Sequence, residues 1–233
     1  MTWRNFYFVL LFGLTITCLP PEAAGQTHPK RIRKPAVTAR PTAIVIAESG
    51  TIEGMLYGNK ELAFTFLIPG TWHYYSGVQN KAALDSGRQT AKISQVNLSK
   101  PEQEALDASI ANTQILFQAT PFPLGDPKNT ALLSCGIERL QAATTKEKYA
   151  AANKKLVLLT PNSKITKDVY AVTFGGVSFT GFDVEGSAAG KTYRQNYLVT
   201  VRNGVALFFV TTLQDEKYDQ MLDYSLKTIK FMR

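Results

Sequence analysis

The chain has 233 residues, of which 45% are hydrophobic and 19% charged, and its formal net charge is +8. These proportions exclude a wholly disordered chain, and the length favours one well-buried core over several domains. The positive charge would indicate a nucleic-acid-binding protein only if basic and aromatic side chains were interleaved. They are not, so nucleic acid is not an expected partner.

The first 25 residues have the order of a secretory signal peptide. Arg4 is followed by an uncharged apolar stretch from Phe6 to Leu19, and small residues then lead to Gly25. We expect cleavage between Gly25 and Gln26, and therefore an exported protein that is periplasmic or extracellular. The apolar stretch is shorter than the roughly 20 residues of a membrane-spanning helix, so a retained anchor is the lesser alternative.

The segment 26–43 carries most of the net positive charge. It contains five basic residues and no acid, which leaves +3 of the +8 for the rest of the chain. Its three prolines favour a disordered linker between the signal peptide and a single domain over 44–233. Such an arm would hold the protein weakly at an anionic membrane surface, by about 1 kcal/mol per basic residue, or act as a solvated spacer. The basic residues are Lys30, Arg31, Arg33, Lys34 and Arg40.

The two cysteines exclude an internal disulfide once the signal peptide is removed. Cys18 lies in the apolar stretch of the signal, which leaves Cys135 alone. A lone cysteine within the apolar run 131–137 is interpreted as a small buried hydrophobic residue. A lipoprotein signal is a weaker alternative, because Thr15 stands where such a signal has leucine, three residues before Cys18.

The first half of the domain combines short β segments with one capped helix. The expected elements are a strand pair or bent strand over 43–46 and 51–57, a turn at 58–61, and strands over 62–68, 91–96, 114–119 and 131–138. Phe64, Phe66 and Ile68 would share one face, because strand side chains alternate with a period of two. Ser99 and Glu102 have the spacing of a capping box, which predicts that a helix begins there.

A second capping box, Thr144 with Glu147, predicts a helix that continues to about Leu158. The expected strands that follow are 169–174, 177–184, 192–201 and 205–213, with Gly175-Gly176 as a bend or bulge. Asn203-Gly204 predicts a type I′ hairpin turn. Asp215 should cap a final helix whose inner stripe is formed by Tyr218, Met221, Leu222, Ser225 and Ile229.

Two stretches resemble PsbP-like domains. Leu62 to Trp72 is similar to the opening strand, proline and tryptophan of that family, and the end, a hairpin at Asn203-Gly204 followed by a helix, is similar too. In element order the resemblance covers roughly Leu56 to Phe231, with a departure in the long segment Ser76 to Lys100. It implies an α+β fold, a largely antiparallel twisted sheet flanked by helices in an α/β/α sandwich. It also implies a family of mostly non-enzymatic accessory or partner-binding proteins, but no functional residue carries over.

No catalytic motif is complete. Gly186 to Thr192 looks like a phosphate-binding loop, but it has three residues between its glycines instead of four and is followed by a strand pattern. His28 falls in the linker, and His73 beside Trp72 is interpreted as a structural, hydrogen-bonded residue. We therefore expect no catalytic residue, no metal site and no cofactor.

Two weaker hypotheses concern sites that sequence spacing cannot establish. Trp72, Tyr74 and Tyr75 would wall a ligand pocket unless they fill the core or cover a sheet edge. Four acids would form a carboxylate-based active site if they met in space, although turns and caps explain their positions. These acids are Asp183, Glu185, Asp215 and Glu216.

The function that the sequence favours is an exported, non-catalytic binding or accessory module of the bacterial cell envelope. Its ligand would be an unknown protein or small molecule. The alternatives are a surface-tethered ligand carrier or structural protein, and an enzyme with a carboxylate-based site.

Overall fold

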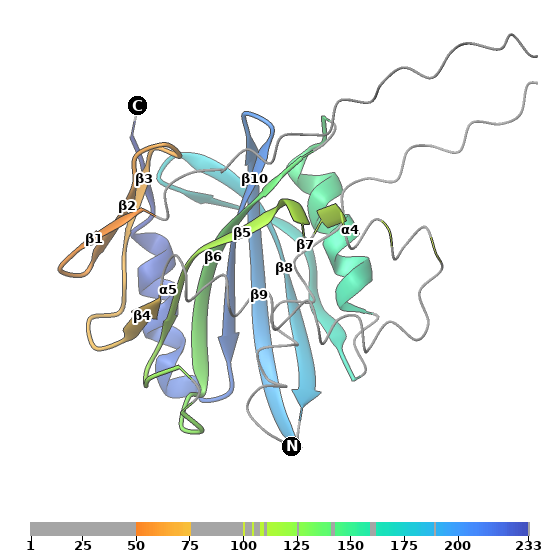
Figure 1. Ribbon diagram of the computed structural model, residues 1–233. Coiled ribbons are helices and arrows are strands. Elements are labelled where there is room, and N and C mark those ends of the chain that lie inside the picture. Colours follow the sequence, from red (N-terminus) through yellow and green to blue (C-terminus); the bar gives the residue numbers. More distant parts are fainter. Residues whose placement is uncertain are drawn as a thin grey trace, which may run out of the picture.

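The computed structural model describes residues 50–75, 111–124, 126–140, 143–158, 162–188 and 190–232, together with 100, 104, 108 and 109. The expected signal peptide with its cleavage site, the basic linker, the strands over 43–46 and 91–96, and the capping box Ser99 with Glu102 lie outside the described residues. The described part has an α+β fold with a seven-stranded and a four-stranded antiparallel sheet. Two of its helices, Lys146–Val157 and Asp219–Lys227, pack against these sheets (Figure 1).

The seven-stranded sheet forms the centre of the molecule. Every neighbouring pair in it is antiparallel. Its strands lie in the order β4 (His73–Tyr75), β5 (Thr113–Thr120), β6 (Ala131–Arg139), β10 (Val205–Leu213), β9 (Lys191–Arg202), β8 (Val177–Ala188) and β7 (Lys164–Phe174).

The four-stranded sheet brings the two ends of the described chain together. Its strands lie in the order β1 (Thr51–Glu53), β2 (Leu56–Asn59), β3 (Phe64–Leu67) and β11 (Lys230–Phe231). The expected strand over 51–57 is therefore a hairpin. The strand expected from 62 begins at 64, because the turn before it runs on through Ala63, whose φ is 52°. Phe64, Phe66 and Ile68 are all buried, which confirms their shared face.

Two hairpin turns depend on residues that tolerate positive φ. Asn203 and Gly204 have φ of 50° and 74° and join β9 to β10, as predicted. Gly175 and Gly176 have φ of 54° and 77° and join β7 to β8 as a tight turn, so the expected bend or bulge was wrong. The irregular register lies inside β7, between Ile165 and Tyr170.

The two helices agree with the predicted positions but differ in detail. Helix α4 spans Lys146–Val157, and its cap is Thr145 rather than Thr144, because the Thr145 hydroxyl accepts from the Lys148 amide at 3.2 Å. Asp215 caps the 3₁₀ turn Glu216–Tyr218, which leads directly into α5 (Asp219–Lys227). The expected inner stripe was right for the buried Leu222, Ser225 and Ile229.

Met221 does not belong to that stripe. Its side chain is 38% exposed, whereas Leu226 is buried in its place. The reason is geometric, because residues three and four positions apart share a helix face. A stripe through Leu222 and Ile229 therefore includes Leu226 and leaves Met221 at the side.

The helices lie on opposite faces of the seven-stranded sheet (Figure 1). Helix α5 and the four-stranded sheet cover one face and enclose the larger apolar core, in which the aromatic rings of Phe64, Phe66 and Phe209 are in contact. Helix α4 covers β7, β8 and β9 on the other face and encloses a second core. None of the helices in the described part of the chain is long and apolar enough to cross a membrane.

Candidate functional site

The three aromatic residues expected at a pocket have three different surroundings. Trp72 is 6% exposed and packs edge-on against Tyr218, with ring centroids 5.6 Å apart. Tyr74 is 48% exposed. The Tyr75 hydroxyl accepts from the backbone amide of Leu124 at 2.5 Å. None of the three lines either of the two hollows described below.

The two reactive side chains singled out in the sequence, Cys135 and His73, lie in different surroundings. Cys135 is fully buried in the larger core, and burial raises the pKa of its thiol, as expected for a structural residue. His73 is exposed and lies on β4 opposite Thr120. Its exposure does not support the predicted structural role. Among the described residues, no group of three His, Cys, Asp or Glu side chains is placed to hold a metal ion.

The four acids of the carboxylate hypothesis each have a partner. Asp183 accepts hydrogen bonds from the Tyr170 hydroxyl at 2.8 Å and from the Asn196 amide at 2.7 Å. Glu185 pairs with Lys164 at 2.6 Å. Asp215 accepts from the Lys217 amide at 3.2 Å, and Glu216 lies 3.7 Å from Arg194. Asp183 and Glu185 lie within β8, whereas Asp215 and Glu216 lie at the cap and the first position of the 3₁₀ turn.

An open hollow of about 360 Å³ lies at the ends of β7, β8 and β9. It includes Gly186 and Ser187 of the sequence that looks like a phosphate-binding loop. That segment belongs to β8 and has no helix after it, so no aligned helix amides face the hollow. The lysine in its lining, Lys164, is already paired with Glu185. Among the described lining residues, Lys164 is therefore the one basic side chain, and its charge is already paired.

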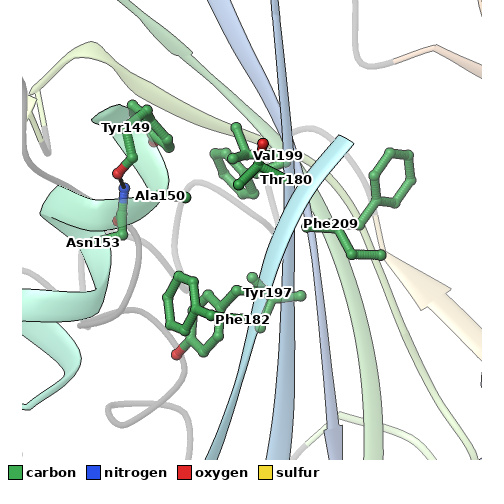
Figure 2. Close-up of a pocket in the computed structure, with 11 residues that line it drawn as sticks. Tyr149, Ala150, Asn153, Thr180, Phe182, Tyr197, Val199 and Phe209 are labelled. Carbon is green, nitrogen blue, oxygen red and sulfur yellow. Dashed lines mark hydrogen bonds between the residues drawn. The ribbon is translucent and has the colours of Figure 1, made fainter. Parts of the chain in front are cut away.

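A second hollow lies between α4 and the seven-stranded sheet, and we call it the α4 hollow. Its volume is about 20 Å³, close to the space of one water molecule. Figure 2 shows Tyr149, Ala150 and Asn153 of α4 on one side, with Phe182 and Tyr197 of the sheet near them. The lining residues are Tyr149, Ala150, Asn153, Thr180, Phe182, Tyr197, Leu198, Val199, Phe208, Phe209 and Val210.

The floor of the α4 hollow contains two aromatic rings that are stacked on each other. Phe182 on β8 and Tyr197 on β9 are directly opposite each other in the strand register. Their rings are stacked with centroids 4.7 Å apart and planes 4° apart. Ala150 faces this floor from α4 and is 1% exposed. Because alanine is short, the space above the two rings is left unfilled.

Asn153 brings one unpaired polar atom to this apolar space. Its residue is 3% exposed, and its Nδ2 donates to the Tyr149 carbonyl one turn earlier at 3.0 Å. In the part of the chain that the structure describes, no donor reaches its Oδ1. The other polar side chains of the lining are paired. Tyr149 donates to Glu138, Thr180 to Glu147 at 3.3 Å, and Tyr197 to Gln195 at 2.8 Å.

A buried carboxyl group anchors the first turn of α4. Glu138 on β6 is 0% exposed and accepts from Ser109 Oγ at 2.5 Å and from the Tyr149 hydroxyl at 2.6 Å. Burial raises the pKa of Glu138 to about 7, although both hydrogen bonds oppose the rise. Burial, and after it the nearby Glu138 carboxylate, raise the pKa of Tyr149. Tyr149 therefore joins this acid to the α4 hollow.

Sequence reasoning missed Asn153 and Glu138. Each carried a local signal, because asparagine is unfavourable inside a helix and a glutamate interrupts the apolar strand over 131–139. Neither signal points to the other elements that meet there.

No protein-family model and no curated protein matches this sequence. Several solved structures resemble it in fold. CyanoP, the PsbP of the cyanobacterium Synechocystis, is 10% identical, with 81% of this chain and 99% of that chain covered and a TM-score of 0.44. PsbP is also the protein after which the family that the two sequence stretches resemble is named.

Two further structures cover about half of this chain. LpqN of Mycobacterium tuberculosis, described as involved in cell envelope biogenesis, is 17% identical, with 52% of this chain and 79% of that chain covered and a TM-score of 0.40. PA94 of Pseudomonas aeruginosa, a protein of unknown function, is 14% identical, with 50% and 79% covered and a TM-score of 0.39. At these identities the likeness concerns the fold and carries no information about ligands or activity.

Proposed function

We propose that this chain is an exported, non-catalytic binding module of the bacterial cell envelope, and that it binds a small apolar molecule in the α4 hollow. The observation that carries the proposal is the lining of that hollow. Ligand sites are typically lined by apolar and aromatic side chains with a few polar groups that fix orientation. The α4 hollow has this composition, with Asn153 as its unpaired polar group.

Binding requires α4 to shift outward. A cavity of roughly 150 Å³ accommodates a benzene ring, whereas the α4 hollow measures about 20 Å³. The floor cannot yield easily, because β8, β9 and β10 are each hydrogen-bonded to a strand on both sides. Within the described residues, helix α4 is attached to the sheet by side-chain contacts alone. The buried bond from Tyr149 to Glu138 at 2.6 Å anchors its first turn, whereas Lys154 with Asp168 at 2.6 Å is at the surface, where ion pairs contribute about 0–1 kcal/mol.

The cellular setting of the proposal comes from the N-terminal sequence. The order of charge, apolar stretch and small residues before Gly25 is that of a signal peptide. If the full chain is expressed in a bacterium, mass spectrometry of the envelope fraction should find a protein that begins at Gln26. A chain that keeps its first 25 residues and stays in the cytoplasm would contradict this part of the proposal.

Binding in the α4 hollow is tested by filling it. The exported protein is titrated with toluene and with phenol, and saturable changes in its NMR spectrum are measured. The variant Ala150→Leu should lose the binding, because the larger side chain occupies the space above Phe182 and Tyr197. The matched control Ala151→Leu changes a neighbouring α4 residue outside the lining and should keep it. Absence of saturable binding of either probe, or binding that survives Ala150→Leu, would overturn the proposed site.

A further inference from the structure

We infer that the molecule bound in the α4 hollow is a small neutral aromatic compound with one hydrogen-bond donor, such as a phenol or an indole, which donates to Asn153 Oδ1. The inference rests on the proposed function, because it names the ligand class of the same site. Its ring lies against the stacked pair of Phe182 and Tyr197. Three properties of the lining lead to this class: the orientation of Asn153, the pairing of its neighbours and the lack of charge.

The orientation of the Asn153 amide is set by the helix. Nδ2 donates to the backbone carbonyl of Tyr149 at 3.0 Å. The side-chain oxygen Oδ1 could not take its place, because Oδ1 and the carbonyl oxygen are both acceptors. This assigns Nδ2 to the backbone and leaves Oδ1 as the atom without a partner. Burying an acceptor without a donor costs free energy. A ligand that donates a hydrogen bond to Asn153 Oδ1 removes this cost and therefore binds more tightly.

A water molecule is a poor substitute for such a ligand. Buried waters typically make about three hydrogen bonds to polar groups that otherwise lack partners. In the α4 hollow the hydroxyl groups of Tyr149, Thr180 and Tyr197 already donate elsewhere. A water there could donate to Asn153 Oδ1 and to these hydroxyl oxygens, but none of the three hydroxyls would donate to the oxygen of the water.

The rest of the lining selects an uncharged ring. No lining residue is an acid, a lysine or an arginine, so a charged ligand would be buried without a counter-charge. Aromatic rings pack well in offset stacks or edge to face, and the stacked pair of Phe182 and Tyr197 offers aromatic atoms for such a contact. The aliphatic side chains of Val199 and Val210 complete an apolar surround. One polar contact and several apolar ones are the pattern that a phenol or an indole matches.

The experiment compares phenol with toluene, which has a similar shape and no donor. Dissociation constants are measured by NMR titration for the wild type, for Asn153→Leu and for the matched control Asn112→Leu. Asn112 makes the same kind of bond, from its Nδ2 to the Ala108 carbonyl at 2.8 Å, but lies outside the lining. Wild type and Asn112→Leu should bind phenol about tenfold more tightly than toluene, and Asn153→Leu should bind the two within about twofold.

The outcomes separate this inference from the function on which it rests. Equal affinities for phenol and toluene in the wild type, both lost in Ala150→Leu, would overturn the ligand class and leave the proposed site intact. Absence of binding for both probes would overturn both. If Asn153→Leu does not fold, contacts between phenol protons and the Asn153 side-chain amide, seen by NMR in the wild type, test the inference directly. Their absence in a saturated complex would refute it.

Discussion

Replacing Glu138 with glutamine should remove a pH-dependent loss of stability. In the folded protein burial raises the pKa of Glu138 to about 7, whereas the ordinary value is 4.5. Because the folded state holds this proton more tightly, the contribution of Glu138 to stability is fully present below pH 4.5 and is lost as the pH rises to about 7. The gap between the two pKa values, at about 1.4 kcal/mol per pH unit, corresponds to about 3 kcal/mol.

Glutamine is a suitable replacement because it resembles the protonated acid in shape. Its oxygen accepts from Ser109 or Tyr149, and its amide donates to the other hydroxyl. The assay is urea unfolding at pH 5 and at pH 8. The wild type should lose about 3 kcal/mol more than Glu138→Gln between the two pH values, since all other titrating groups are common to both proteins.

The control for this experiment is Glu185→Gln on the same sheet. Glu185 is partly exposed and paired with Lys164 at the surface, so its replacement should leave the additional loss in place. Parallel pH profiles for the wild type and Glu138→Gln, within about 1 kcal/mol, would refute the reasoning, because that is close to the error of such extrapolations.

Two further predictions concern the sheet. Gly136→Ala should destabilise the protein by about 1–3 kcal/mol in urea unfolding, because a Cβ there would meet the Phe208 ring and lie 2.8 Å from the Gln114 carbonyl oxygen; an unchanged midpoint would contradict this close packing. Cys135 should not react with a maleimide in the folded protein and should react fully in urea, because its thiol is buried and its pKa raised; rapid labelling without denaturant would argue against the buried position.

Local patterns were sufficient where one interaction decides the conformation. The alternation of Phe64 and Phe66 identified the inner face of β3, and Asn203-Gly204 identified the β9–β10 turn. Errors arose where neighbouring residues compete for one role. Thr144 and Thr145 are both good caps, and the choice between them depends on where the first turn of α4 rests on the sheet.

The α4 hollow could not be derived from the sequence, because its parts come from segments that are distant in the chain. Asn153 and Ala150 lie on α4, and the stacked pair comes from the facing positions 182 and 197 of two strands. A shift of one residue in that register would turn one of the two rings to the other face of the sheet and separate the pair. The unusual surroundings of Glu138 could not be derived from the sequence either, because they depend on hydrogen bonds from the distant residues Ser109 and Tyr149.

By itself, the sequence led to the expectation of an exported chain. It determined an α+β domain and the positions of most strands and of two helices, because these follow from periodicity, caps and turns within a few residues of one another. Only the tertiary structure decided that Trp72, Tyr74 and Tyr75 do not meet at one site and that an amide oxygen of α4 lies unpaired over an aromatic floor. The physical reason is that burial and pairing are properties of side chains brought together by packing, and no local pattern specifies which distant surfaces will face each other.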